Sequence, residues 1–245
     1  MKGGEVSLKP ILVLALLATF TLSGTAQSTV PEQSPVDVTA GAIRFDPKQP
    51  KLDVSYGVSE LELKYIRKDA AEPDGCTARD HEETEEAEVT PGSGHVTVAG
   101  IRYELVQFHF HTPSEHRFGG HAYPLEMHLV HRSAEGKLLV IGVPLKPGPR
   151  SAVDKVLAKL APECGEPVEV SAVDLDRLLP ANRRTLHYNG SLTTAPFTEG
   201  VAWYLTTELT VTPATIARFQ GLFHDGNARQ TQPLNGRTLV TVPRT

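Results

Sequence analysis

The stretch QFHFHTPSEH (residues 107–116), followed by LEMHLV (residues 125–130), decides the fold and the chemistry of this chain. Side chains alternate between the two faces of a β-strand. Gln107, His109 and His111 therefore share one face, while Phe108 and Phe110 share the other. The pattern predicts a strand with one apolar face for the core and one histidine-bearing face.

The second stretch has the same periodicity and adds a third histidine. Glu126, His128 and Val130 lie in phase along it. Two imidazoles from one strand and one from its neighbour leave the fourth position of a tetrahedral zinc ion open, which is the pattern of a catalytic zinc site. The sequence therefore predicts that Zn²⁺ binds to His109, His111 and His128.

Polar residues accompany these histidines on the same faces. A ligating imidazole needs an acceptor for its other N–H group, which sets its tautomer and orientation. Gln107 and Glu126 are placed to hold His109 and His128 in this way. A single histidine on a strand is usually structural, but three in phase, with polar partners, favour a metal site.

Several motifs together resemble the α-class carbonic anhydrases. These are QFHFHTPSEH, then PLEMHLVH (residues 124–131), and SLTTAP (residues 191–196), with shorter matches at QSP (33–35), NAR (227–229) and QPLN (232–235). The resemblance runs from about residue 33 to residue 241. It implies a mainly β, single-domain fold on a large, twisted, mostly antiparallel sheet with short peripheral helices.

The resemblance also implies zinc-dependent, reversible hydration of carbon dioxide to bicarbonate and a proton. Thr193 would accept a hydrogen bond from the attacking hydroxide and donate its own to Glu115, because an ionised carboxylate can only accept. The backbone carbonyl of Asn227 would hold His111. His81 would relay protons to solvent, although its Arg-Asp-His context departs from the family pattern.

An apolar pocket beside the metal would hold carbon dioxide, and Thr194 would contact bicarbonate. By resemblance, the pocket is lined by Val130, Val140, Leu192, Val201 and Trp203. Sulfonamides and anions are expected to inhibit.

Residues 1–26 have the features of a signal peptide: two lysines, a mostly apolar segment over residues 10–22, and Gly24-Thr25-Ala26 as a small-residue cleavage site. The apolar segment is shorter than the ~20 residues that span a bilayer. We expect an exported protein, periplasmic or secreted, with residues 27–245 as one domain and no membrane association after cleavage.

The charge of the chain argues against a nucleic-acid partner. The full chain carries a net charge of −5, and loss of residues 1–26, with two Lys and one Glu, makes it −6. Without basic tracts, such a domain is not expected to bind nucleic acid.

Periodicity predicts further elements along the chain. A hairpin is expected over residues 96–106 with Gly100 in its turn, and helices over 151–160 and 214–222. The acidic stretch from Arg67 to Pro91 is interpreted as an exposed loop that leads into an edge strand.

The chain has two cysteines, Cys76 and Cys164. A cysteine pair in an exported protein favours a disulfide. By resemblance, the segments that carry these cysteines approach each other at the rim of the active site. The bridge usual in exported family members would involve the position of Phe197 and is not available here.

Two alternatives compete with this interpretation. His109, His111 and Glu115 also match the metal motif of cupins, although the third histidine follows too soon for that barrel. The second alternative is a carbonic-anhydrase-like domain with weak or no activity, which the short N-terminal segment before Gln33 suggests.

Overall fold

The computed structural model describes residues 30–67 and 82–241. The proposed signal peptide, His81 and Cys76 lie outside the described residues. From Pro31 onward the described residues belong to one compact unit. Within the described ranges, no helix has both the length and the apolarity needed to cross a bilayer.

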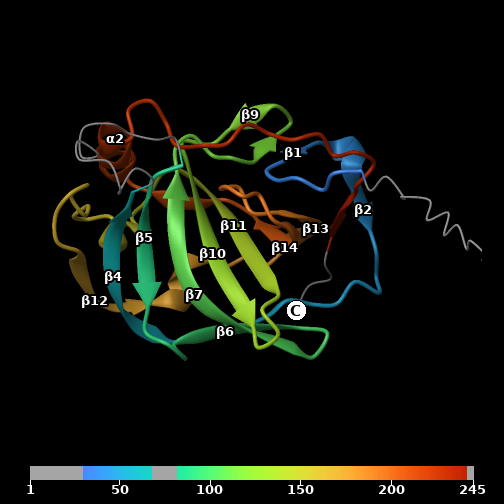
Figure 1. Ribbon diagram of the computed structural model, residues 1–245, viewed down its shortest axis with the longest axis horizontal. Helices are drawn as coiled ribbons and strands as arrows, with labels where there is room; N and C mark the ends of the chain where they lie inside the picture. The colour runs from blue at the N-terminus through green and yellow to red at the C-terminus, as the bar shows by residue number, and fades with distance from the viewer. Residues whose placement is uncertain (1–29, 68–81, 242–245) are drawn as a thin grey trace, which may run out of the picture. The chain divides into compact units, whose positions relative to one another are not determined.

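One large mixed sheet carries the site, and its central strands β5, β7, β10 and β11 lie side by side in Figure 1. Its pairs are mostly antiparallel, but β11–β14, β11–β15 and β16–β2 are parallel. In spatial order, its strands are β12 (Val168–Asp174), β4 (Val58–Ile66), β5 (Thr84–Val89), β7 (Ile101–His111), β10 (Leu125–Ser133), β11 (Leu138–Pro147), β14 (Glu199–Thr206), β13 (Thr185–Ser191), β16 (Leu239–Thr241) and β2 (Ile43–Phe45).

Shorter elements surround this path. The strands are β15 (Leu209–Val211) beside β11, β3 (Asp53–Tyr56) beside β6 (Gly94–Val98), and a separate sheet of β1 (Asp37–Val38), β8 (Arg117–Phe118) and β9 (His121–Ala122). The helical elements are η1 (Ala40–Ala42), α1 (Val153–Val156), η2 (Leu175–Leu178) and α2 (Pro213–Leu222). The mainly β fold with short helices is confirmed.

The apolar face of β7 packs into the main core. Phe108 and Phe110 are completely buried there, and Phe219 of α2 meets the ring of Phe110 edge-on at 5.9 Å. Helix α2 begins at Pro213, after Thr212 accepts the N–H of Thr215 as its N-cap. The helix predicted over residues 214–222 is therefore present, and it packs Phe219 against the apolar face of the histidine-bearing strand.

The predicted helix over residues 151–160 is reduced to the single turn α1. Its apolar residues Val153, Val156 and Leu157 are buried in the core, which accounts for the helical spacing. The Asp154 carboxylate accepts hydrogen bonds from Ser151 and Thr212, so it anchors the turn to the start of α2.

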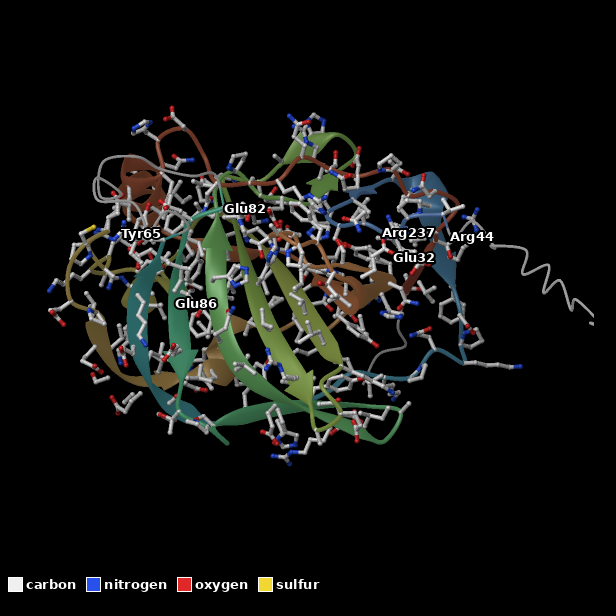
Figure 2. All side chains as sticks on the ribbon, in the orientation of Figure 1. Glu32, Arg44, Tyr65, Glu82, Glu86 and Arg237 are labelled. Carbon is white, nitrogen blue, oxygen red and sulfur yellow. The ribbon has the colours of Figure 1, made fainter. Side chains whose placement is uncertain are left out.

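The interpretation of the acidic stretch as an edge strand is wrong. Strand β5 lies between β4 and β7, inside the sheet, and Glu85 is completely buried. Figure 2 labels Glu86 on this strand, where it pairs with His109 of β7. Acidic composition suggested exposure, but two neighbouring strands cover both edges of this segment.

Candidate metal centre

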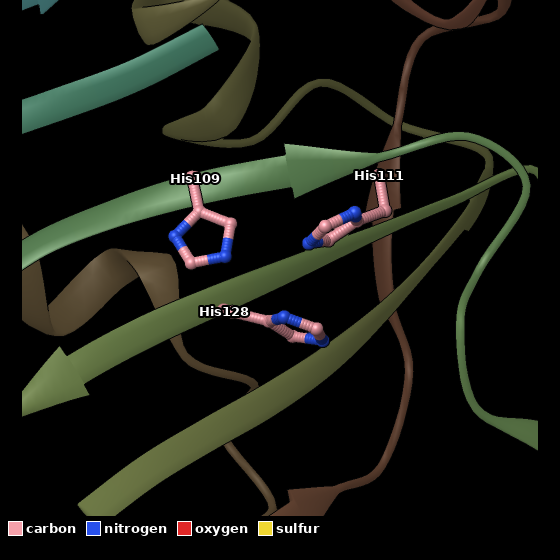
Figure 3. Close-up of side chains that lie close together, drawn as sticks. All are labelled: His109, His111 and His128. Carbon is pink, nitrogen blue, oxygen red and sulfur yellow. The ribbon is translucent and has the colours of Figure 1, made fainter. Parts of the chain in front are cut away.

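The register of β7 and β10 brings three imidazoles together. His128 lies opposite His109, and Glu126 lies opposite His111. One ring nitrogen from each of His109, His111 and His128 lies within 4.8 Å of the others. The three rings face a common point in Figure 3, with ring centroids 4.7–5.3 Å apart.

Each imidazole also has one nitrogen beside an acceptor. His109 Nδ1 lies 2.9 Å from Gln107 Oε1, and His111 Nδ1 lies 3.1 Å from the carbonyl oxygen of Asn227. His128 Nε2 lies 3.1 Å from Glu126 Oε1. These acceptors would direct Nε2 of the first two rings and Nδ1 of the third toward a bound metal.

The protonation states suit a metal. Burial lowers the pKa of His111 to about 4 and also lowers the pKa of His128, so both rings are neutral at neutral pH. Neutral imidazole is the ligand form. His111 Nε2 is buried and forms no hydrogen bond with the described part of the chain. Leaving such a polar atom unpaired is costly, and a bound cation would satisfy it. Three imidazole nitrogens fit zinc with an open position.

A buried hydrogen-bonded chain supports Glu126. The His116 Nδ1–H and backbone N–H groups donate to its carboxylate, both at 2.8 Å. His116 Nε2 lies 2.7 Å from the Tyr188 hydroxyl, which lies 2.8 Å from Ser34 Oγ. Burial alone would raise the pKa of Glu126, but His116 and His128 hold it well below its usual range. An ionised Glu126 therefore orients His128.

Glu115 lies beside the cluster and is also buried. Burial raises its pKa to about 7, while His128, the Arg229 backbone N–H and the Thr193 hydroxyl lower it. The Arg229 N–H donates to Glu115 Oε1 at 2.9 Å. Thr193 itself is buried, so the two proposed orienting groups meet out of solvent.

The residues predicted for the apolar pocket also meet. Val140, Val201 and Trp203 are buried in one cluster, with Val130 and Leu192 packed against it. The Trp203 ring lies 4.9 Å from the His128 ring, which places this cluster next to the three histidines. Thr194 is half-buried in the loop that follows Leu192.

Sequence reasoning missed several residues that support the site. Tyr188 and Arg229 carry no periodic signal, and Ser34 and Arg229 appeared only within short matched motifs. Their partners lie far along the chain: Ser34 is 154 positions from Tyr188, and Gln33 is 196 positions from Arg229. Only the folded chain identifies such partners.

The structure also places three further histidines and one cysteine. His116 and His131 are buried, and His131 lies beside Tyr56 on the other face of β10, whereas His121 is exposed. Cys164 is not a free thiol. Since Cys76 lies outside the described residues, the bond between the two cysteines stays a prediction.

Comparison with known proteins gives a consistent result. A family model described as eukaryotic-type carbonic anhydrase matches residues 23–243. A carbonic anhydrase from a Nostoc species is 40% identical over 154 residues, which is 61% of this chain and 58% of that protein. The match thus spans less than two thirds of this relative's length.

Solved structures extend the similarity to most of the chain. An alpha-carbonic anhydrase of Photobacterium profundum has 34% identity and a TM-score of 0.71, covering 88% of this chain and 90% of its own. The alpha-carbonic anhydrase of Thermovibrio ammonificans, solved with the inhibitor sulfanilamide, has 30% identity and a TM-score of 0.72, covering 85% and 86%.

Proposed function

The chain belongs to the eukaryotic-type carbonic anhydrase family, and from this premise we propose that it catalyses the reversible hydration of carbon dioxide to bicarbonate and a proton. The observation that carries the proposal is the convergence of three imidazoles from β7 and β10, each with one ring nitrogen beside a polar oxygen. The cupin alternative is wrong, because the fold is that of alpha-carbonic anhydrases.

We propose that zinc is the cofactor, held by His109, His111 and His128. When bound, zinc supplies a hydroxide nucleophile at neutral pH by lowering the pKa of water from 15.7 to about 7. The protein would contribute the three imidazole donors, and Gln107, Glu126 and the Asn227 carbonyl would hold the rings in position.

Thr193 and Glu115 would orient the nucleophile. One Glu115 oxygen already accepts the Arg229 N–H, and in its ionised form the carboxylate can only accept. The Thr193 hydroxyl must then donate to Glu115, which leaves its oxygen lone pairs to accept the proton of the nucleophile. This arrangement turns a lone pair of the nucleophile toward the substrate.

The substrate would lie in the apolar cluster around Trp203. Carbon dioxide has no net dipole, so the valine and leucine side chains of this cluster suit it better than polar groups would. Thr194, at the more exposed side of the loop, would contact bicarbonate as it leaves. We further propose export of the chain after loss of residues 1–26, and inhibition by sulfonamides and anions.

Stopped-flow hydration of carbon dioxide tests this function. The wild type should accelerate hydration with one zinc per chain by elemental analysis, and sulfanilamide should inhibit it. His111→Ala should lose both the metal and the activity, because two ligands cannot enclose the ion. A zinc-loaded wild type without hydratase activity would instead favour the alternative of a non-catalytic zinc-binding domain.

A further inference from the structure

The loop that carries Thr193 is closed at its base by its own backbone. Leu192 donates to the carbonyl of Thr198 at 2.9 Å, and Phe197 donates to that of Thr194 at 2.9 Å. These bonds shape the loop but do not place it relative to Glu115, which follows β7. The distance between Thr193 and Glu115 must therefore be set by contacts between segments.

Arg229 makes these contacts. Its guanidinium carbon lies 3.7 Å from the centroid of the Phe197 ring, on the Thr193 loop. Its Nη1 donates to Gln33 Oε1 at 3.1 Å and to the Ser34 carbonyl, and its backbone N–H donates to Glu115. One residue thus joins the loop, the N-terminal segment and the orienting carboxylate.

Two further contacts hold the loop on either side of this stack. Gln33 Nε2 donates to the carbonyl oxygen of Phe197 at 3.2 Å. Glu82, labelled in Figure 2, accepts the backbone N–H of Ala195 at 3.2 Å. Burial lowers the pKa of Arg229 while Glu115 and Glu82 raise it, and a guanidinium stays charged at neutral pH.

The backbone conformation of Phe197 is unusual for a residue with a large side chain. Its φ of +59° lies in the left-handed region, which bulky residues rarely adopt. Glycine would be the residue of least strain at such a position. A phenylalanine there needs compensation, and the face of its ring is covered by a cation.

We propose that Arg229, stacked on Phe197, is a positioning residue that holds the Thr193 loop against Glu115. The inference rests on the proposed function of Thr193 and Glu115. The attraction between a partly desolvated cation and an aromatic ring is strong enough to change the equilibrium between the closed and the open loop about tenfold. Small displacements at a reacting centre reduce rates by comparable or larger factors.

Three variants test the stack. Phe197→Leu keeps an apolar side chain but removes the π face, and Phe197→Tyr keeps the face. Phe45→Leu is the matched control, because Phe45 is 72% exposed and lies on β2, outside the Thr193 loop. Phe197→Leu should lower kcat/KM for hydration about tenfold with zinc still bound, while Phe197→Tyr and Phe45→Leu should match the wild type.

Hydrogen exchange of the peptide over residues 191–199 gives a readout that does not depend on activity. Exchange should be about tenfold faster in Phe197→Leu and in Arg229→Met, and no faster in the double variant than in either single one. Equal exchange in Phe197→Leu and the wild type, or additive effects in the double variant, would overturn the inference. A wild type without hydratase activity would overturn the proposed function and leave the exchange result to decide the stack.

Discussion

At the scale of single residues, hydrogen-bond direction determines what the site can do. Glu115 and Thr193 contribute through which atom donates and which accepts, so small substitutions separate their role from metal binding. The Glu115 carboxylate accepts a hydrogen bond from the Arg229 N–H. A glutamine amide in its place would, in one of its two orientations, turn its NH₂ group toward that N–H, so that two donors would face each other.

Glu115→Gln and Thr193→Ala should therefore each reduce hydration by about 10²–10³, the usual cost of losing a preorganised partner. Zinc content should stay at one per chain. Thr193→Ser is the control, because it keeps the hydroxyl. Hydration at the wild-type rate in both variants would refute the proposed orientation, whatever the metal content.

Glu85 is a buried acid outside the metal centre. It is completely buried, and the backbone of Ala161 offsets only part of the effect of that burial on its pKa. Burial raises its pKa to about 8, against 4.5 as the ordinary value. The folded chain therefore binds this proton more tightly than the unfolded chain, and its contribution to stability falls as pH rises from about 4.5 to about 8.

Glu85→Leu should remove this dependence. Each pH unit across the window corresponds to about 1.4 kcal/mol, an upper figure for a group that water can reach on relaxation. Between pH 5 and pH 8, the free energy of unfolding of the variant should rise by several kcal/mol relative to that of the wild type. Urea unfolding at both pH values measures these free energies. If the difference between the two proteins were the same at pH 5 and pH 8, the predicted role of Glu85 would be wrong.

At the scale of elements, the spacing of β10 and β11 controls the support of His128. Gly142 of β11 lies opposite His128. A Cβ atom at this position would lie 2.8 Å from Leu205 Cδ2 and 3.0 Å from Glu126 Oε1. The second atom accepts from His116 and lies 3.1 Å from His128 Nε2, so the glycine makes room for this carboxylate.

Gly142→Ala should displace Glu126 and weaken zinc binding by about 10–100-fold, as losses of such supporting contacts do. Gly41→Ala is the matched control, because no atom lies within 4 Å of its Cβ position. Competition with a chelator measures the zinc affinity. Equal affinity in the two variants would mean that Leu205 and Glu126 move aside without loss.

At the scale of the whole molecule, the order of strands decides which residues are buried. The acidic strand β5 is enclosed by β4 and β7, although its composition is typical of an exposed edge. Tyr65 of β4 donates to Glu83 at 2.8 Å, and Lys64 lies 2.9 Å from Glu88. The neighbouring strand β4 thus provides partners for two of the acids on and beside β5.

The proposed bond between Cys76 and Cys164 belongs to this scale. It would close a loop of about 89 residues, and chain entropy assigns such a closure roughly 4–5 kcal/mol as an upper value. Denatured, unreduced protein should show no free thiol on titration, and reduction should lower the unfolding temperature. Two titratable thiols per chain would disprove the bond without affecting the zinc chemistry.

The sequence by itself determined the local geometry of the metal centre. The alternation of β7 and β10 placed His109, His111 and His128 on one side and the phenylalanines on the other, because the period of a strand depends only on the backbone. The same reasoning identified Gln107 and Glu126, which lie on the ligand faces. The family motifs added Thr193, Glu115 and the apolar cluster.

Only the tertiary structure decided the partners that hold these groups in place. The Tyr188 hydroxyl reaches Ser34 across 154 positions, and Arg229 reaches Gln33 across 196. The burial of β5 likewise follows from strand order. No periodicity encodes these contacts, because they depend on how distant segments pack, and packing selects partners by shape and by the cost of leaving buried polar groups unpaired.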